Sequence, residues 1–161
     1  METVAVYWES RIKTYGFQRI TDLSLFEFFS PFSEIKQIGE FFSQSKFQDL
    51  NSKFIVAQES DEGLTFAVCL PLKKEEAFYK SLKENRGLTF VRHIFPAGII
   101  YFHGPHFGDR YGVADATLST LSRAGINILA TDCSSASVFL VLAHEDLDRA
   151  EEELSRTFET V

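Results

Sequence analysis

The sequence of 161 residues contains little cysteine and little proline, with two and four residues respectively. Cys69 and Cys133 are too few for a disulfide framework and too far apart for a zinc-binding motif. Each falls in a segment that is rich in strand-forming residues. We therefore expect both cysteines to be small buried side chains in strands, in a reducing compartment.

Basic residues and long apolar runs are also scarce. Lysine and arginine number 16 against 23 aspartate and glutamate residues, which gives a net charge of −7. Nucleic acids and anionic membranes bind clustered basic surfaces, so neither is an expected partner. No apolar run approaches the roughly 20 residues of a membrane span, and the first residues lack the features of a signal peptide. We expect a cytoplasmic protein.

Phenylalanine, by contrast, is abundant, with 17 residues in a chain that is 45% hydrophobic. These residues are spread along the sequence at strand and helix spacings. They predict a core packed by phenylalanine rather than an aromatic platform for stacking a ligand. The length fits one domain or two small units of about 70–80 residues each.

Residues 23–96 predict a first β-α-β-β-α-β unit. Apolar alternation and turn residues separate its elements. Ser30-Pro31 is typical of a helix start, Gly63 of a hairpin turn and Pro96 of a strand end. The expected strands are 23–29, 54–59, 64–70 and 88–95, and the expected helices begin at residues 31 and 73.

Residues 97–161 predict a second unit with the same element order but without its last strand. The expected strands are 98–103, 126–133 and 137–143, and the expected helices are 111–124 and 145–158. Residues 1–22 are expected to form a short strand, 4–8, and a connector with some extended structure, 9–22. The strand could complete the second sheet, because an open apolar edge invites aggregation. It could instead extend the first unit or pack as an arm.

The stretch from His103 to Leu129 is the most informative part of the sequence. An apolar strand leads into the glycine-rich segment H-G-P-H-F-G-D-R-Y-G, and a helix follows. Backbone N–H groups at a helix start have no partner within the helix, and the helix dipole favours an anion there. The segment predicts a site for a small anionic or zwitterionic ligand.

Three motifs in this second unit resemble those of the ACT domain, a regulatory module that binds small molecules in amino-acid metabolism. Residues 108–113 match its D-x-P-G-hydrophobic loop, with Tyr111 in place of proline. Residues 124–128, A-G-I-N-I, match a second motif, and Ser134-Ser135 match the small polar turn of the aspartokinase branch. The motifs cover residues 98–158, whereas residues 23–96 share only the element order.

The resemblance implies an α+β fold with two ferredoxin-like βαββαβ units side by side, each an antiparallel sheet with helices on one face. The tandem resembles the regulatory C-terminal region of aspartokinases; the sequence contains no kinase domain. Carried over from the family, the ligand-binding residues are Gly108, Asp109, Tyr111, Gly112, Val113, Ala114, Asn127, Ile128 and Leu129. The first unit has Phe29-Ser30-Pro31-Phe32-Ser33 at the equivalent loop, and we expect it to have lost ligand binding.

These observations favour a non-catalytic regulatory module that binds an amino acid or a similar metabolite. The resemblance also implies association into a homodimer, or with an enzyme of amino-acid metabolism. The alternative is a structural or protein-interaction module without a metabolite. Asp109 could simply cap the following helix, Asn127 could satisfy strand-edge groups, and Ser134 and Ser135 could be plain turn residues.

Other chemistries have weaker support in the sequence. His103, His106 and Asp109 do not have the spacing of metal ligands on one helix face, and no metal or cofactor is expected. Cys133 with His103 or His144 lacks a nucleophile motif, so we expect no catalytic residues. The RNA-recognition motif shares the element order, but no strand here reads as its K/R-G-F/Y-G/A-F-V-x-F/Y segment.

Overall fold

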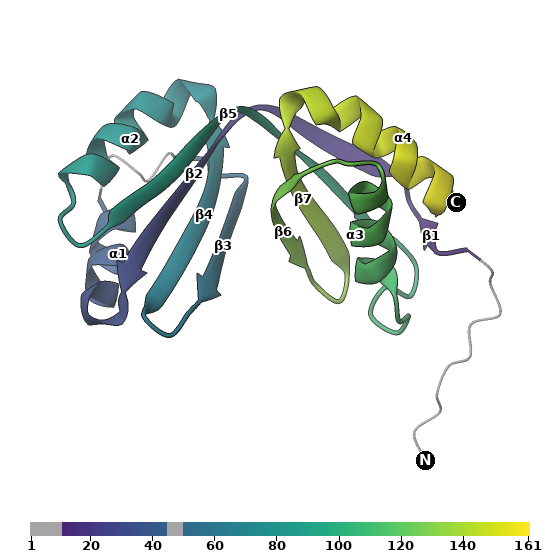
Figure 1. The fold of residues 1–161 in the computed structure, drawn as a ribbon, viewed down its shortest axis with the longest axis horizontal. Helices are drawn as coiled ribbons and strands as arrows, with labels where there is room; N and C mark the ends of the chain where they lie inside the picture. Colours follow the sequence, from purple (N-terminus) through teal and green to yellow (C-terminus); the bar gives the residue numbers. More distant parts are fainter. Residues whose placement is uncertain (1–10, 45–49) are drawn as a thin grey trace, which may run out of the picture. The chain divides into compact units, whose positions relative to one another are not determined.

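The computed structural model describes residues 11–44 and 50–161 (Figure 1). Backbone contacts divide the chain into two units. Residues 22–97 form one, here called the central unit. The residues before 22 and residues 98–161 form the other, here called the terminal unit. No described helix is long and apolar enough to cross a membrane.

The central unit has a four-stranded sheet with two helices packed on one face. Its strand order is β3-β4-β2-β5, where β2 and β5 contribute the parts that lie within this unit. Both β2 and β3 run antiparallel to β4. The elements are β2 (Phe17–Pro31), α1 (Ile35–Phe42), β3 (Phe54–Glu59), β4 (Gly63–Pro71), α2 (Glu75–Glu84) and β5 (Thr89–His103).

Phenylalanine fills the core of the central unit, as the composition predicted. Successive side chains of a strand point to opposite faces, so Phe26 and Phe28 share the face toward the helices. The Phe28 ring stacks on Phe66 with centroids 5.3 Å apart, and it also contacts Phe41 of α1 and Phe78 of α2. These side chains lose nearly all contact with solvent. Their burial fixes both helices on this face.

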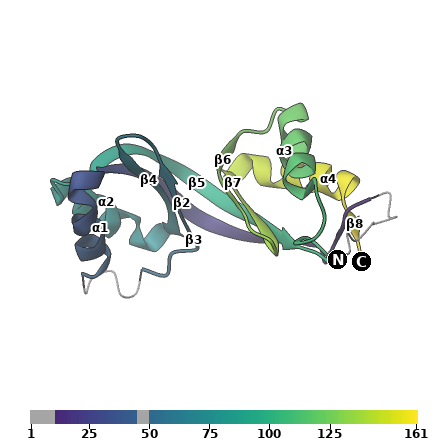
Figure 2. The ribbon, with the colours of Figure 1, turned by 90° about the horizontal axis from the view of Figure 1, so that it is seen from below.

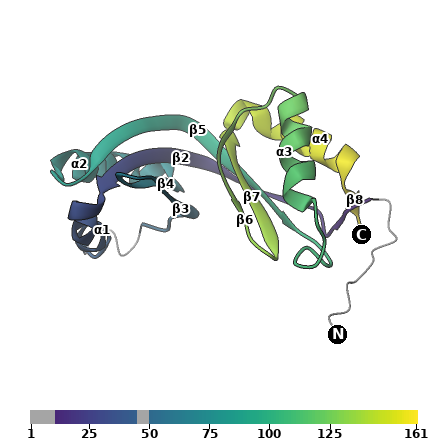
Figure 3. The same ribbon diagram turned by 60° about the horizontal axis from the view of Figure 1, so that its bottom comes forward.

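The terminal unit repeats this arrangement with other parts of the chain. Its strand order is β2-β5-β7-β6, and α3 and α4 pack on one face (Figures 2 and 3). Two short strands, β1 and β8, pair in parallel near the chain ends. The elements are β1 (Lys13–Thr14), α3 (Val113–Arg123), β6 (Ile128–Cys133), β7 (Ser137–Ala143), α4 (Leu147–Thr157) and β8 (Glu159–Thr160).

The predicted fold class, two βαββαβ units with antiparallel sheets, is confirmed, but the origin of one strand differs. The strand expected at residues 4–8 lies outside the described residues. The connector expected over 9–22 contains β1 and the start of β2. Residues 17–21 of β2 pair next to β5 and supply the fourth strand of the terminal sheet. Three of these five residues are polar and exposed, so the segment has no regular apolar alternation that a hydrophobicity pattern could detect.

Several predicted element boundaries were wrong. Pro96 does not end a strand, because β5 continues through a cis Phe95–Pro96 bond to His103. Ser30 forms no side-chain cap; β2 extends to Pro31 and a 3-10 turn follows. A similar turn, residues 144–146, precedes α4. Cys69 is buried as expected, but Cys133 is exposed because it is the last residue of β6 before a turn.

Replacing Phe102 by alanine tests the aromatic core of the terminal unit. Its side chain is 0% exposed and contacts Phe17, Phe107 and Phe158. We expect a loss of about 3–5 kcal/mol in the free energy of unfolding, measured by urea denaturation. The matched control is Phe32→Ala, because Phe32 is 44% exposed and should cost far less. Equal losses would contradict this account of the core.

Candidate functional site

The loop between β5 and α3 is a compact turn, and hydrogen bonds hold His103, the residue at which it begins. Two groups of the N-terminal segment hold His103, because its carbonyl accepts from the Tyr15 N–H at 2.9 Å and from the Thr14 hydroxyl at 2.8 Å. A Cβ on Gly104 would lie 2.2 Å from the Lys13 carbonyl oxygen. Glycine is therefore required where the segment around β1 crosses the loop.

The middle of the loop is closed by two hydrogen bonds to one carbonyl. The N–H groups of Asp109 and Arg110 donate to the His106 oxygen at 3.0 and 2.9 Å. His106 itself has φ +64°, a left-handed conformation that tight turns use. The turn brings the following residues back over the start of α3.

Gly112 precedes α3 in a left-handed conformation with φ +91°. Its carbonyl accepts the first helical bond, from the Ala116 N–H at 2.8 Å. The N–H groups of Val113, Ala114 and Asp115 therefore have no partner within the helix. The N-cap residue, Gly112, has no side chain with which to cap α3, so the alternative in which Asp109 caps the helix stays open. These N–H groups can donate to an anionic group of a ligand.

A cavity of about 240 Å³ lies where this helix start meets the turn between β6 and β7. Buried apolar side chains form part of its wall, whereas Tyr111 is 96% exposed. Arg110 and Ser134 add polar groups. The lining residues are Phe107, Arg110, Tyr111, Gly112, Val113, Ala114, Cys133, Ser134 and Val138. The cavity thus combines an apolar wall with donors suited to a carboxylate.

The structure brings part of the predicted residue set together at this cavity. Tyr111, Gly112, Val113 and Ala114 all line it. Gly108 does not, but it lies against the β6–β7 turn, where an added Cβ would be 3.1 Å from the Ser135 oxygen. Gly108 therefore allows the loop to approach the turn closely. Asp109 is exposed on the loop next to it.

Asn127, Ile128 and Leu129 do not line this cavity. They lie at the start of β6, whereas the cavity contacts β6 at its other end, Cys133. Five residues of extended strand span about 16 Å, so a small ligand cannot touch both ends.

The sequence prediction missed five lining residues: Phe107, Arg110, Cys133, Ser134 and Val138. Arg110 lies within the loop motif. Its positive charge beside the helix-start N–H groups was the sequence signal that it could contribute to binding an anion. The Ser134 hydroxyl accepts from the N–H groups of Ala136 and Ser137 at 3.3 and 3.2 Å. Its predicted role as a turn residue is therefore confirmed, and the same residue faces the cavity.

The remaining titratable groups do not assemble into a second kind of centre. Within residues 11–44 and 50–161, no three His, Cys, Asp or Glu side chains gather as metal ligands would. Burial raises the pKa of the Cys69 thiol to about 12, which keeps it protonated. Cys133, in contrast, is exposed at the cavity.

Comparison with known proteins identifies the fold. No family model and no curated protein matches the sequence. Among solved structures, the regulatory subunit of aspartate kinase from Thermus flavus superposes with TM-score 0.74 and 9% identity, over 89% of this chain and 97% of that chain. The ligand-free regulatory subunit from Thermus thermophilus gives TM-score 0.74 and 11% identity, over 91% and 99%.

The aspartate kinase from Synechocystis is similar over a part of its length. The TM-score is 0.78 at 16% identity, over 92% of this chain and 28% of that chain. The chain therefore has the fold of aspartate kinase regulatory regions, a tandem of ACT-like units, as the sequence motifs predicted.

Gly112→Ala tests whether the site depends on the left-handed backbone at Gly112. An added Cβ meets no atom within 4 Å, so the cost is the backbone conformation alone, about 1–2 kcal/mol in the free energy of unfolding. Gly39→Ala, in α1 with equally open surroundings, is the control and should stabilise by about 0.5–1 kcal/mol. Urea denaturation measures both, and changes of the same sign would contradict the assignment.

The two thiols should react at very different rates. We expect iodoacetamide at pH 8 to alkylate Cys133 in the folded protein and to leave Cys69 unmodified, because Cys69 is buried and its pKa is raised. Mass spectrometry of the Cys69→Ser and Cys133→Ser variants assigns each adduct. In urea both thiols should react. Rapid labelling of folded Cys69 would contradict its burial.

Proposed function

We propose that this chain is a non-catalytic regulatory module that binds an amino acid or a similar small carboxylate at the cavity between the β5–α3 loop and the β6–β7 turn. The observation that carries the proposal is the helix start at Gly112, whose donors face a cavity of amino-acid size. The fold, shared with aspartate kinase regulatory subunits, supports a regulatory role.

Each part of the ligand has a complementary group at the cavity. The N–H groups of Val113 and Ala114 donate to the carboxylate, and the Arg110 guanidinium adds charge. Phe107 and Val138 contact the apolar part of the ligand. The exposed Asp109 carboxylate, or backbone carbonyls, accept from the α-ammonium. The ligand binds as a zwitterion at neutral pH.

Asn127, Ile128 and Leu129 enter this proposal only through a second copy of the chain. They are too far from the loop of their own chain to reach the same ligand. However, β6 is an edge strand in the order β2-β5-β7-β6, so another copy can approach it. A homodimer in which one copy's strand closes the other copy's cavity would couple binding to assembly. A partner enzyme of amino-acid metabolism could occupy the same edge.

The central unit has no equivalent of Gly112. Its loop passes from Pro31 directly into a 3-10 turn, which supports the expectation that it does not bind the metabolite. The chain would then hold one ligand. We also propose that the protein is cytoplasmic, because its net charge is negative and its cysteine content is low.

The alternative function is a structural or interaction module without a metabolite. The same fold and the same β6 edge would serve it. The two proposals differ at Gly112, since a purely structural loop has no reason to leave helix-start donors facing a cavity. Ligand binding by the isolated protein therefore decides between them.

A calorimetric screen of the twenty amino acids tests the proposed function. We expect at least one to bind, and Gly112→Asp to weaken it tenfold or more, because the added carboxylate repels the ligand carboxylate. Gly112→Asn is the matched control, with the same side-chain shape and no charge. No binding at millimolar concentration, or equal loss in both variants, would contradict the proposal.

The same ligand should protect Cys133 from alkylation, because Cys133 lines the cavity. Protection that follows the calorimetric dissociation constant locates the ligand there. Binding without protection would place the ligand elsewhere.

A further inference from the structure

A second polar cavity lies in the terminal unit, on the outer side of its two helices. It has a volume of about 340 Å³ and lies between the end of α3 and the facing side of α4. Its lining residues are Thr120, Arg123, Ala124, Arg149, Glu153 and Thr157. Only one of these, Ala124, is apolar. The cavity shares no residue with the loop cavity around Gly112.

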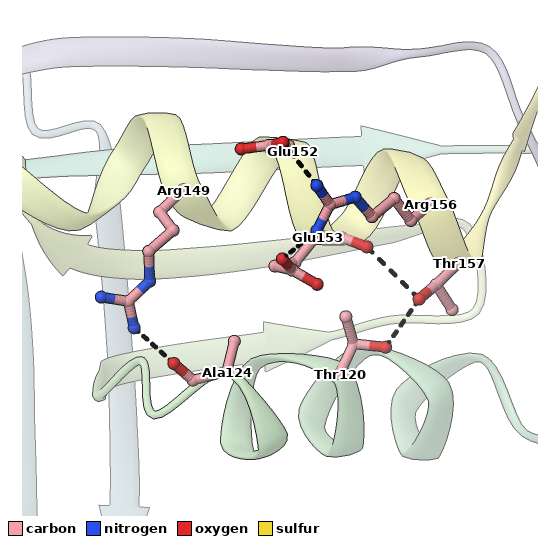
Figure 4. A network of polar contacts seen from close by, with 7 residues as sticks. All are labelled: Thr120, Ala124, Arg149, Glu152, Glu153, Arg156 and Thr157. Atoms are coloured by element: carbon pink, nitrogen blue, oxygen red, sulfur yellow. Dashed lines mark hydrogen bonds and ion pairs between the residues drawn. The ribbon is translucent and has the colours of Figure 1, made fainter.

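Arg149 is held in a fixed position at this cavity. Its guanidinium donates to the Ala124 carbonyl at the end of α3 (Figure 4). A second nitrogen lies 3.9 Å from the Asp146 carboxylate, beyond hydrogen-bond distance. A guanidinium has five N–H donors in a planar fork, so Arg149 retains donors for a ligand.

Arg123 brings a second guanidinium to the same cavity. It lies in the last turn of α3 and forms no hydrogen bond or ion pair with any residue that the structure describes. Glu153 is the one acidic lining residue, and Arg156 on α4 forms an ion pair with it at 2.5 Å. The cavity therefore has two guanidiniums and one carboxylate, and Arg156 bridges that carboxylate to the neighbouring Glu152.

The opposite wall supplies hydrogen-bond acceptors. The Thr120 and Thr157 hydroxyl oxygens lie 2.9 Å apart, and the Thr157 hydroxyl can also donate to the Glu153 carbonyl (Figure 4). The Thr120 hydroxyl can donate to the Ala116 carbonyl. Two hydroxyl protons serve three hydrogen bonds, so neither threonine has a donor to spare. Lone pairs of both oxygens remain. A ligand that meets this wall gains by donating an O–H or N–H group.

We propose that this cavity is a second ligand site, for a small oxyanion that carries a hydrogen-bond donor beside its charge. Arg123 and Arg149 bind the oxyanion, and the threonine hydroxyls accept from the donor. Hydrogen phosphate and hydroxycarboxylates both have this chemistry. The site is independent of the metabolite cavity, and occupancy would tie the end of α3 to α4.

Titrations with inorganic phosphate and with malate test the proposal at constant ionic strength. Chemical shifts of backbone amides in a ¹H–¹⁵N spectrum report binding and its location. We expect saturable shifts at Thr120, Ala124 and Thr157 with phosphate, malate or both, and the responding probe tells whether the site takes a phosphate or a carboxylate. Saturation by neither probe at millimolar concentration would overturn the proposal.

Arg123→Gln is the decisive variant, because Arg123 forms no hydrogen bond or ion pair with the described part of the chain. We expect it to weaken probe binding at least tenfold while the midpoint of thermal unfolding stays unchanged. Arg86→Gln is the matched control: Arg86 is exposed in the central unit, and its loss changes the net charge equally. Equal weakening by both variants would show general charge attraction and overturn the site.

Gly112→Asp separates this site from the metabolite cavity. Probe binding should survive this substitution, and amino-acid binding should survive Arg123→Gln. If Gly112→Asp abolishes the phosphate or malate shifts, the probes occupy the loop cavity and the second site is wrong. If no amino acid binds in the calorimetric screen but phosphate or malate still binds here, the proposed metabolite site is wrong and the second site is supported.

Discussion

The alternation of side chains along β2 and β5 is the constraint on which both units depend. Each strand contributes residues to both sheets, and in each unit its inward residues are large and apolar. Phe26 and Phe28 meet α1 and α2, whereas Ile100 and Phe102 meet α3 and α4. A shift of one residue in register would turn these side chains to the opposite face. The two cores therefore fix where every helix packs.

The loop cavity depends on glycine at close approaches and on one left-handed residue. Gly104 admits the segment around β1, Gly108 admits the β6–β7 turn, and Gly112 turns the chain into α3. A side chain at Gly104 would force the segment around β1 away, whereas one at Gly108 would be in tight contact with the β6–β7 turn. The N–H groups at the helix start are consequently held against a wall that comes from a distant part of the sequence. This arrangement places the helix-start N–H groups at one end of the cavity.

Arginine has two distinct roles on the helical side of the terminal unit. Arg19 bridges Asp148 and Glu151, and the hydrogen bond to Asp148 is the main cause of its raised pKa. Arg149 satisfies a carbonyl at the end of α3, where the helix dipole favours a cation. Arg123, in the last turn of α3, forms no hydrogen bond or ion pair with a described residue. We propose that its partner is the ligand of the polar cavity that it lines.

The sequence by itself determined the two βαββαβ units, the phenylalanine core and the loop before α3, because hydrophobic periodicity and glycine positions are local signals. It also indicated most of the loop side of the cavity, from Tyr111 to Ala114. Tertiary structure alone decided that residues 17–21 complete the terminal sheet and that Cys133 and Ser134 form the opposite wall. It also separated Asn127 from the loop by the length of β6. Pairing between distant segments depends on which edges meet in the folded chain, and no local pattern records that choice.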